Sequence, residues 1–566
     1  MKNAFNHLTT EYEDCLKEGV VPFSEYPRPQ LIRDSYLCLN GEWDFEIIGK
    51  TPYVGKILVP FVPESRISGV FKEIKKRDVL VYKRNFTIDE GFIKDKVFLH
   101  VGACDQFAKV YVNEILVKEN EGILPFSVDV TSLVKTGINT IKIVATDPLD
   151  KTIPYGKQKV KRGGMWYTKT SGIWQTVWME STVFNPISSI KIKTDLNGVD
   201  ILVNGGESEK KIILLGKEYG FTGNKIRIDI ENPVHWSPEN PHLYYFDLIS
   251  GDDKVTSYFG LRTVDIGTND GRKAILINGK PIFFHGLLDQ GYYSDGIVLP
   301  ASSKGFLDDV LKMKKCGFNM LRKHIKFEPD LFYYYCDKYG MFVFQDMVNS
   351  GRYSFLIDTA LPTVFLKKGV SHFASKRRRK IFKKTALGVL DGLFNHPSVV
   401  YYTIFNEGWG QFSEKENYNL LKNADPSRIY DTTSGWFKKS CTDVESDHVY
   451  FKKIKPTKRN DKPWVLSEFG GYSYKINKHS FNPDKTYGYK FFTDGDLFEK
   501  AFSDLYETEI IPAIENGLCA SVYTQVSDVE DETNGLLTYD RRILKMDENK
   551  LKEISNKLLK AFNKEI

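Results

Sequence analysis

Two stretches decide the fold of the C-terminal half: VVYYTIFNEGWG, from Val399 to Gly410, and PWVLSEFGG, from Pro463 to Gly471. Each is an apolar run, rich in β-branched and aromatic residues, that ends in a glutamate with glycines close behind. Such a run is typical of a strand buried in a parallel sheet. A carboxylate at the end of that strand faces the mouth of an α/β barrel. The two stretches therefore predict that Glu407 and Glu468 converge at one barrel mouth.

Six more apolar runs alternate with helix-length amphipathic segments in the same half of the chain. The eight expected strands are 281–288, 318–324, 341–347, 398–406, 428–435, 448–451, 463–468 and 518–525. Eight strand–helix units in roughly 290 residues match the number and length expected of a (β/α)8, or TIM, barrel. We expect this barrel to occupy residues 269–566.

The first half of the chain is rich in strands. KVFLHVG (96–102), FAKVYVNEILV (107–117) and NTIKIVATD (139–147) alternate apolar and polar residues, as half-buried antiparallel strands do. They predict a jelly-roll β-sandwich over residues 1–183. Short, evenly spaced strands between 188 and 266 predict a smaller immunoglobulin-like sandwich over residues 184–268.

Polar and aromatic residues follow every expected barrel strand, where a barrel gathers its catalytic loops. Two carboxyls there are what retaining cleavage of a glycosidic bond needs, one as nucleophile and one as acid/base. Asn406 is suited to the 2-hydroxyl of the sugar, and Tyr450 can donate to the nucleophile. For each of Asp289, Asp346 and Tyr450, a role in the site and a structural role are about equally favoured. Trp436 and Gln525 are as well suited to packing behind the site as to contact with the substrate. The site residues expected beside the two glutamates are Asp289, Arg322, His324, Asp346, Asn406, Trp409, Trp436, Tyr450, Tyr523 and Gln525.

Composition excludes several classes of function. The net charge of +6 is small for 566 residues, so a solvated surface is favoured over nucleic-acid binding. The densest basic run, SKRRRKIFKK (375–384), is expected on the outer face of a helix. Seven scattered cysteines without a CxxC pair predict free thiols in a reducing cytoplasm, with neither disulfides nor a zinc site. The N-terminal segment shows no secretory leader and no run reaches membrane-spanning length, so no membrane partner is expected.

The order of the three domains, a β-sandwich followed by an immunoglobulin-like block and a barrel, resembles that of glycoside hydrolase family 2. This family includes β-galactosidases, β-glucuronidases and β-mannosidases. FNEGWG is similar to the acid/base motif of that family, which implies this role for Glu407 with Asn406 beside it. SEFGG is similar to the nucleophile motif and implies that role for Glu468. LRKH resembles the strand-two motif that ends in a substrate-site histidine, here His324. GGMWYTKTSGIWQTVWME, from Gly163 to Glu180, is similar to the signature closing the sugar-binding-like domain.

The loop after the eighth strand departs from the β-glucuronidase pattern. β-Glucuronidases carry an Asn-x-Lys pair there for the substrate carboxylate, whereas this chain reads SDVEDETNGLLTYDRR, from Ser527 to Arg542. A uronic acid would meet Asp528, Glu530, Asp531 or Glu532, a conflict of like charges. The C-terminal β domains and metal ligands of the long β-galactosidases are not matched either.

We therefore expect a retaining exo-β-glycosidase that acts on a carbohydrate, β-galactosides first, without metal or cofactor. A β-mannosidase, a β-glucuronidase and an arabinopyranoside-cleaving relative are the alternatives within that class. A non-catalytic carbohydrate-binding protein on a barrel scaffold is the alternative of another class. Because relatives in the family use their β domains as interfaces, the resemblance also leaves a homo-oligomer open.

Overall fold

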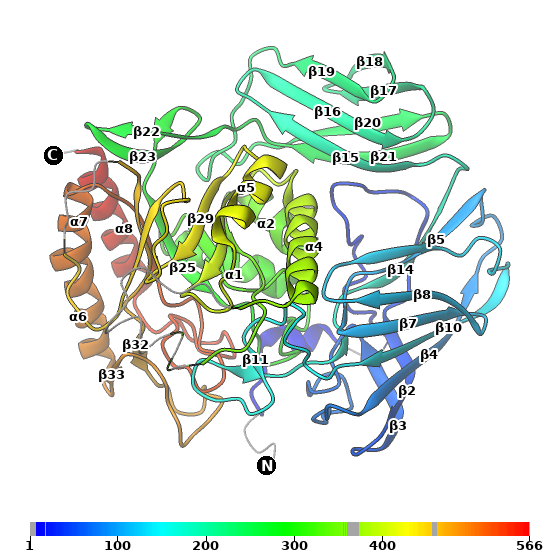
Figure 1. The fold of residues 1–566 in the computed structure, drawn as a ribbon, viewed down its shortest axis with the longest axis horizontal. Helices are drawn as coiled ribbons and strands as arrows, with labels where there is room; N and C mark the ends of the chain where they lie inside the picture. The colour runs from blue at the N-terminus through cyan, green and yellow to red at the C-terminus, as the bar shows by residue number, and fades with distance from the viewer. Residues whose placement is uncertain are drawn as a thin grey trace.

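The computed structural model describes residues 7–16, 19–354, 356, 358, 373–455 and 461–564. These residues form two β-sandwiches and a barrel (Figure 1), as the sequence predicts. The expectation about the N-terminal segment falls partly on residues 1–6, which lie outside the described part. None of the helices in the described residues is long and apolar enough to cross a membrane.

The first sandwich packs two antiparallel sheets over one core. Along β2 the odd-numbered side chains Trp43, Phe45 and Ile47 are buried and the residues between them are exposed, which is the period of two that the sequence shows. The larger sheet runs β3 (Tyr53–Val59), β2 (Gly41–Ile48), β4 (Val79–Ile88), β10 (Gly137–Thr146), β7 (Phe107–Val112), β8 (Ile115–Glu121). The smaller runs β1 (Tyr36–Cys38), β14 (Val177–Thr182), β5 (Lys96–Val101), β9 (Phe126–Asp129). Two short pairs complete it: β6 (Cys104–Asp105) with β13 (Gly172–Ile173), and β11 (Gln158–Lys159) with β12 (Tyr167–Thr168).

The alternation from Phe107 to Val117 covers two strands, not a single one. The chain reverses at Asn113 and Glu114, whose φ angles of 48° and 66° lie in the left-handed region. Two consecutive left-handed residues make the tight hairpin turn that fits the twist of antiparallel strands. Because neither residue is glycine or proline, the sequence pattern gives only Asn113 as a weak turn signal.

The second sandwich has the strand number of a small immunoglobulin-like domain. One sheet runs β15 (Ile187–Thr194), β16 (Gly198–Gly205), β19 (Lys225–Asp229), and the other β18 (Lys217–Thr222), β17 (Glu209–Leu214), β20 (Tyr244–Ser250), β21 (Asp253–Phe259). A separate small sheet follows, with β22 (Val264–Asn269), β23 (Arg272–Ile277) and β24 (Lys280–Pro281). The expected domain boundary at 268/269 falls inside this sheet.

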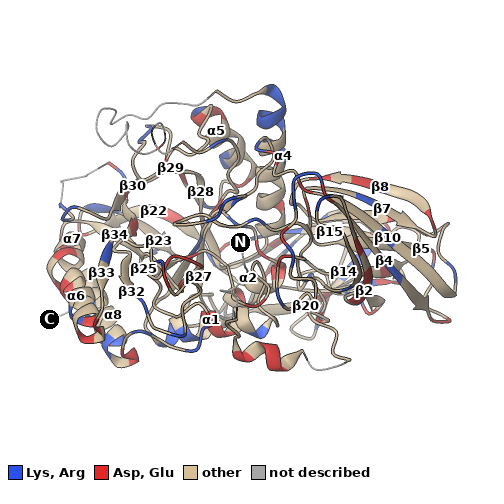
Figure 2. Ribbon diagram, turned by 90° about the horizontal axis from the view of Figure 1, so that it is seen from below, with Lys and Arg blue, Asp and Glu red and all other residues tan. Residues whose placement is uncertain are grey.

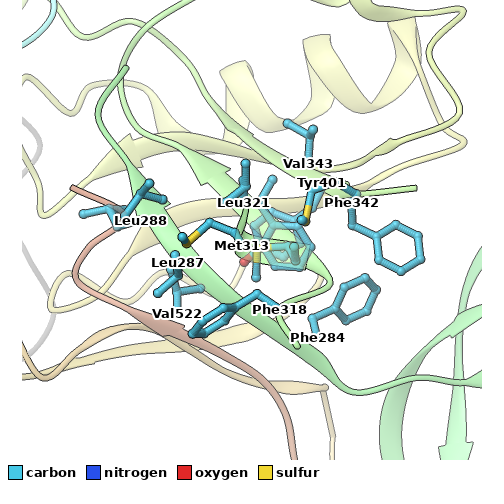
Figure 3. Packing of buried hydrophobic residues seen from close by; sticks show 14 of the residues in the cluster. Phe284, Leu287, Leu288, Met313, Phe318, Leu321, Phe342, Val343, Tyr401 and Val522 are labelled. Carbon is cyan, nitrogen blue, oxygen red and sulfur yellow. The ribbon is translucent and has the colours of Figure 1, made fainter. Parts of the chain in front are cut away.

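The third unit is a nearly closed barrel of eight parallel strands. Its order is β29 (Ile429–Ser434), β28 (Val399–Asn406), β27 (Phe342–Asp346), β26 (Met320–Lys323), β25 (Phe284–Asp289), β34 (Leu518–Tyr523), β31 (Trp464–Phe469), β30 (Glu445–Val449). Most of these strands are buried on both faces, which explains their unbroken apolar runs. Figure 3 shows the packing of the core, with Phe284, Leu321 and Val522 contributed by three different strands.

Helices cover the barrel, but not after every strand. The chain passes from β29 to β30 through residues 435–444 without a helix, so the expected eight strand–helix units are incomplete there. The basic run 375–384 begins α4, whose first turns are largely blue in Figure 2. Lys376, Arg377 and Arg379 are exposed as expected, whereas Arg378 is buried. The helices are α1 (Lys304–Lys315), α2 (Asp330–Tyr339), α4 (Lys376–Leu393), α5 (Glu414–Ala424), α6 (Gly495–Leu505), α7 (Ile511–Glu515) and α8 (Glu548–Asn563). Shorter elements are the 3-10 helix Glu11–Cys15, the π-helix Tyr506–Ile510, and the pair β32 (Tyr472–Tyr474) with β33 (Lys490–Phe492).

Buried polar contacts fasten the second sandwich to the barrel. The hydroxyl of Tyr258 on β21 donates to Oδ2 of Asp337 on α2 at 2.8 Å. The indole of Trp236 donates to the carbonyl of the same Asp337 at 2.7 Å. Asp337 is fully buried, so these bonds satisfy groups that water cannot reach.

All seven cysteines of the chain are free, as the scattered spacing predicts.

Candidate active site

Glu407 and Glu468 come together at the C-terminal ends of β28 and β31. An Oε atom of Glu407 and one of Glu468 lie within 4.8 Å of each other. Glu407 follows the last residue of its strand with a left-handed φ of 50°, and its N–H donates to the carbonyl of Ser434 at 3.0 Å. The side chain of Glu407 is 18% exposed and that of Glu468 is 6% exposed. The pair is therefore asymmetric, with one carboxyl open to solvent and one enclosed.

Glu468 is held as a carboxylate by its neighbours. Nη1 of Arg322 donates to its Oε1 at 3.0 Å, and the hydroxyl of Tyr450 donates to its Oε2. Burial works to raise the pKa of Glu468, but the charges of His448, Arg322 and His324 outweigh burial and lower that pKa to about 2. Glu468 is therefore ionised across the physiological range.

His448, which was not among the site residues expected from the sequence, lies between the two glutamates. Its Nδ1 is 2.8 Å from Oε1 of Glu407 and 3.6 Å from Oε2 of Glu468. Burial works to lower the pKa of His448, and the charges of Glu468 and Glu407 raise it above its ordinary value. One signal in the sequence could have found it: His448 precedes Tyr450 by two residues, and such residues share a face of a strand.

Arg322 connects the remaining polar residues of the site. Its guanidinium is fully buried and donates to both carboxylate oxygens of Asp346, at 3.0 and 3.1 Å, and to Oδ1 of Asn406 at 2.8 Å. Nδ1 of His324 lies 2.7 Å from Oδ2 of Asp346. Burial would raise the pKa of Asp346, but the charge of Arg322 and the hydrogen bond from His324 lower it. Because Arg322 occupies Oδ1 of Asn406, the amide NH2 of Asn406 is left to donate.

Aromatic residues frame one side of the glutamate pair. The rings of Tyr450 and Tyr489 stack with centroids 3.7 Å apart and planes 12° apart. The hydroxyl of Tyr450 also lies 3.1 Å from Oγ1 of Thr524. The indole of Trp436 donates to the carbonyl of His448 at 3.2 Å, so Trp436 lies beside the site.

Four expected residues make their contacts outside this network. Asp289 pairs with Nζ of Lys323 at 2.6 Å. Trp409 is buried in an aromatic cluster with Tyr155 and Trp166, with ring centroids 5.5 and 5.0 Å away. Tyr523 packs among Phe469, Phe502 and Tyr506. Gln525 donates to Oε2 of Glu532 at 3.0 Å and to Oδ1 of Asn534 at 2.9 Å.

All four acids that follow β34 have partners inside the protein. Asp528 pairs with Nζ of Lys545 at 2.6 Å. Glu530 accepts from the N–H of Thr168 at 2.9 Å, and Asp531 pairs with Arg162 at 3.1 Å. Glu532 accepts from Tyr167 at 2.5 Å and from Gln525 at 3.0 Å, so each of the four carboxylates is held by a group of the protein.

One group of residues in the described part of the chain has ligand atoms close enough for a metal ion. Glu407, His448 and Glu468 each offer one atom within 4.8 Å of the others. The same atoms are engaged with one another and, in Glu468, with Arg322 and Tyr450. A cavity of about 440 Å³ opens between β23, β34 and α8, lined by Gly517, Leu518 and Phe562, and no residue expected at the site lines it.

Three family models of glycosyl hydrolase family 2 match successive parts of the chain. The galactose-binding domain-like model matches residues 56–175, a second family model matches 182–262, and the TIM barrel model matches 269–543. The chain belongs to glycosyl hydrolase family 2. Within this family 2 protein, Glu407 and Glu468 both lie in the segment matched by the barrel model.

Relatives of this family 2 protein carry different substrate names. A β-galactosidase of Thermoanaerobacter pseudethanolicus is 24% identical over 518 residues, covering 81% of this chain and 63% of that protein. A β-glucuronidase of Felis catus is 25% identical over 378 residues, covering 58% of this chain and 54% of that protein. The chain thus spans less than two thirds of the length of either relative.

Two solved structures share the fold across nearly the whole chain. The β-D-glucuronidase of Dictyoglomus thermophilum has a TM-score of 0.74 at 19% identity and covers 94% of this chain and 98% of that one. A β-galacturonidase of Eisenbergiella tayi has a TM-score of 0.69 at 18% identity and covers 95% of this chain and 98% of that one. At this level of identity the likeness shows the fold alone.

Proposed function

We propose that this protein is a retaining exo-β-glycosidase that hydrolyses terminal β-linked sugars by double displacement. The observation that carries the proposal is the approach of Glu407 and Glu468 to within 4.8 Å. Retaining enzymes hold their two carboxyls about 5 Å apart, whereas inverting enzymes keep about 6.5–9.5 Å for a water molecule. The short separation supports direct attack by one carboxylate on the anomeric carbon.

The asymmetry of the pair supports one assignment of roles. Glu468, ionised and fixed by Arg322 and Tyr450, attacks the anomeric carbon and forms the glycosyl–enzyme ester. Glu407, the more exposed carboxyl, gives its proton to the leaving oxygen and then takes a proton from the attacking water. The amide of Asn406 donates to the 2-hydroxyl of the sugar, a contact that strengthens in the transition state.

We further propose β-galactosides as the first substrate class, with β-mannosides, β-glucuronides and arabinopyranosides as the alternatives. Relatives and structural neighbours named for galactosides, glucuronides and galacturonides support the class of reaction without choosing the sugar. The seven free thiols support a reducing, cytoplasmic setting. A panel of nitrophenyl glycosides would rank these sugars by their kcat/KM values.

The role of Glu468 can be tested by trapping. We expect a 2-deoxy-2-fluoro β-glycoside to inactivate the enzyme and to label the peptide that contains Glu468, because the fluorine slows hydrolysis of the ester. Glu468→Ala should lose roughly 10⁴-fold or more in kcat, since no other group near the anomeric carbon can form the ester. A label on any other residue, or full turnover by the alanine variant, would refute the assignment.

The role of Glu407 has a separate signature. Glu407→Ala should lose most activity on alkyl glycosides yet keep rapid glycosylation with dinitrophenyl glycosides, whose leaving groups need no proton. Added azide should then restore turnover and give a β-glycosyl azide. If the wild-type protein and both variants fail to turn over any glycoside, the protein is instead a carbohydrate-binding protein on a barrel scaffold.

A further inference from the structure

A segment of the first sandwich reaches the mouth of the barrel. At Gly156 an added Cβ would lie 3.0 Å from the carbonyl oxygen of Ile325, the neighbour of His324. Farther along, the hydroxyl of Tyr167 donates to Oε2 of Glu532 at 2.5 Å. The barrel-mouth segment, residues 156–168, thus packs between the loops that follow β26 and β34 and brings side chains of another domain to the site.

Lys157 on this segment differs from three buried lysines nearby, each of which has an ion pair. Lys323 pairs with Asp289 at 2.6 Å, Lys326 with Glu328 at 2.9 Å, and Lys545 with Asp528 at 2.6 Å. Lys157 is partly buried, and its Nζ lies 6.0 Å from the ring centroid of Tyr167. It has neither an ion pair nor a side-chain hydrogen bond with any residue that the structure describes. A partly buried ammonium that lacks both an ion pair and a hydrogen bond is costly, which suggests that a ligand supplies one of these contacts.

Glu532, in the loop that follows β34, is joined to the barrel-mouth segment by its hydrogen bond with Tyr167. Its Oε2 accepts from Tyr167 and from Gln525, the latter at 3.0 Å, whereas its Oε1 has no hydrogen bond from a described residue. Burial raises the pKa of Glu532, and the charge of Lys157 works against that rise. The charge of Lys157 also contributes to lowering the pKa of Glu468. Lys157 therefore lies near both carboxylates, yet it approaches neither within the 4.0 Å of an ion pair.

We propose that Lys157 and Glu532 determine specificity for the glycone: the ammonium donates to, and the carboxylate accepts from, hydroxyl groups of a neutral sugar. A hydroxyl is both donor and acceptor, so two neighbouring hydroxyls can bridge a cation and an anion that do not touch. A uronic acid fits this pair less well, because its carboxylate would meet Glu532. This inference rests on the proposed glycosidase function and adds the groups that read the sugar.

The test is a cycle between protein variants and deoxygenated substrates. Lys157→Met keeps the apolar stem and removes the donor, and Glu532→Gln keeps an acceptor for Tyr167 while removing the charge. We expect kcat/KM for the preferred neutral glycoside to fall about 10- to 100-fold in each variant. For the matching 4-deoxy or 6-deoxy glycoside, which lacks the hydroxyl that is read, the loss should be less than about threefold. Lys157→Arg should recover part of the activity.

Controls separate this role from a structural one. Lys161→Met removes an exposed cation from the same segment and should leave all rates unchanged. Labelling of Glu468 by the fluorosugar and the thermal midpoint should survive in Lys157→Met. Equal losses on hydroxyl-bearing and deoxy substrates, or no loss, would overturn the inference while the glycosidase function stands. A wild-type preference for uronides that Lys157→Met abolishes would make Lys157 a carboxylate ligand and also overturn it. A wild-type protein inert on every glycoside and unlabelled would refute the function itself.

Discussion

Arg322 is the residue on which most of the site depends. A fully buried guanidinium is tolerable only when its donors are used, and Asp346, Asn406 and Glu468 take them in fixed directions. The planar fork thereby sets the spacing between the amide expected at the sugar 2-hydroxyl and the carboxylate expected at the anomeric carbon. Lysine at this position would keep the charge but lose this geometry.

The position of His448 leads to a prediction about the pH dependence of kcat/KM. Its charge is the largest of those that lower the pKa of Glu468, so His448→Gln should raise that pKa. Glu468 must be ionised to attack, and its ionised fraction is lost as the pH falls through its pKa. The acid limb of the kcat/KM profile should therefore move about one unit toward higher pH.

The matched control for that variant is His479→Gln. His479 lies outside the glutamate network and pairs with Asp540 at 2.7 Å. We expect the acid limb of the kcat/KM profile of His479→Gln to coincide with that of the wild-type protein. An unshifted acid limb in His448→Gln would contradict the electrostatic role assigned to His448.

At the scale of residues, the sequence predicts the glutamates, Asn406, Arg322 and His324, because a strand end fixes where those side chains lie. Lys157 could not be predicted this way, since it reaches the site only through packing of one domain on another. Tyr523 and Trp409 are expected among the site residues from their place in the chain. Their contacts instead are with core aromatic rings, because a residue near a strand end can turn either inward or toward the covering elements.

At the scale of elements, hydrophobic pattern predicts the barrel strands well where both faces are buried. β28 and β31 lie within one residue of the expected ranges. β30 spans Glu445–Val449, earlier than the expected 448–451, because its sequence ESDHV carries polar residues that no apolar pattern marks. Backbone pairing with β31, rather than hydrophobicity, defines that strand.

The end of α2 provides a prediction at this scale. Gly340 caps the helix with a φ of 75°, and an added Cβ would lie 2.4 Å from the carbonyl oxygen of Pro238. Gly340→Ala should lower the free energy of unfolding by about 3 kcal/mol, since it adds a clash to the cost of a left-handed alanine. Gly216 has the same φ of 75° with no atom within 4 Å, so Gly216→Ala should cost only about 1 kcal/mol. Equal losses in urea unfolding would show that the backbone relaxes around Gly340.

At the scale of the whole molecule, the two sandwiches support the barrel in different ways. The first supplies the barrel-mouth segment to the site, whereas the second contacts α2 and the start of β28 on the flank of the barrel. Arg262 of the second sandwich donates to the carbonyl of Val399, the first residue of the strand that leads to Glu407, at 3.0 Å. The sequence predicts all three units, but these junctions become visible only in the folded chain.

The junction between the second sandwich and α2 can be weakened selectively. Tyr258→Phe removes a buried donor to Asp337 and should lower the free energy of unfolding by about 1–3 kcal/mol, because the carboxylate loses a partner that water cannot replace. Tyr245→Phe is the matched control, since that residue is 48% exposed and its hydroxyl lies 3.3 Å from the hydroxyl of Tyr334 at the surface. It should change stability by less than about 0.5 kcal/mol. Indistinguishable urea midpoints for the two variants would contradict the importance of this junction.

The barrel has a seam between β29 and β30, where the described residues form no backbone ladder. At the end near the glutamates the seam is crossed by side chains: Oγ of Ser434 lies 3.1 Å from Nε2 of His448, and the N–H of Gly435 donates to Oγ of Ser446 at 3.3 Å. Glu407 stands on one side of this seam and Glu468 on the other. Two small hydroxyls therefore hold the two edges of the barrel together beside the glutamates, where the backbone ladder is missing, and so contribute to the separation that the proposed chemistry requires.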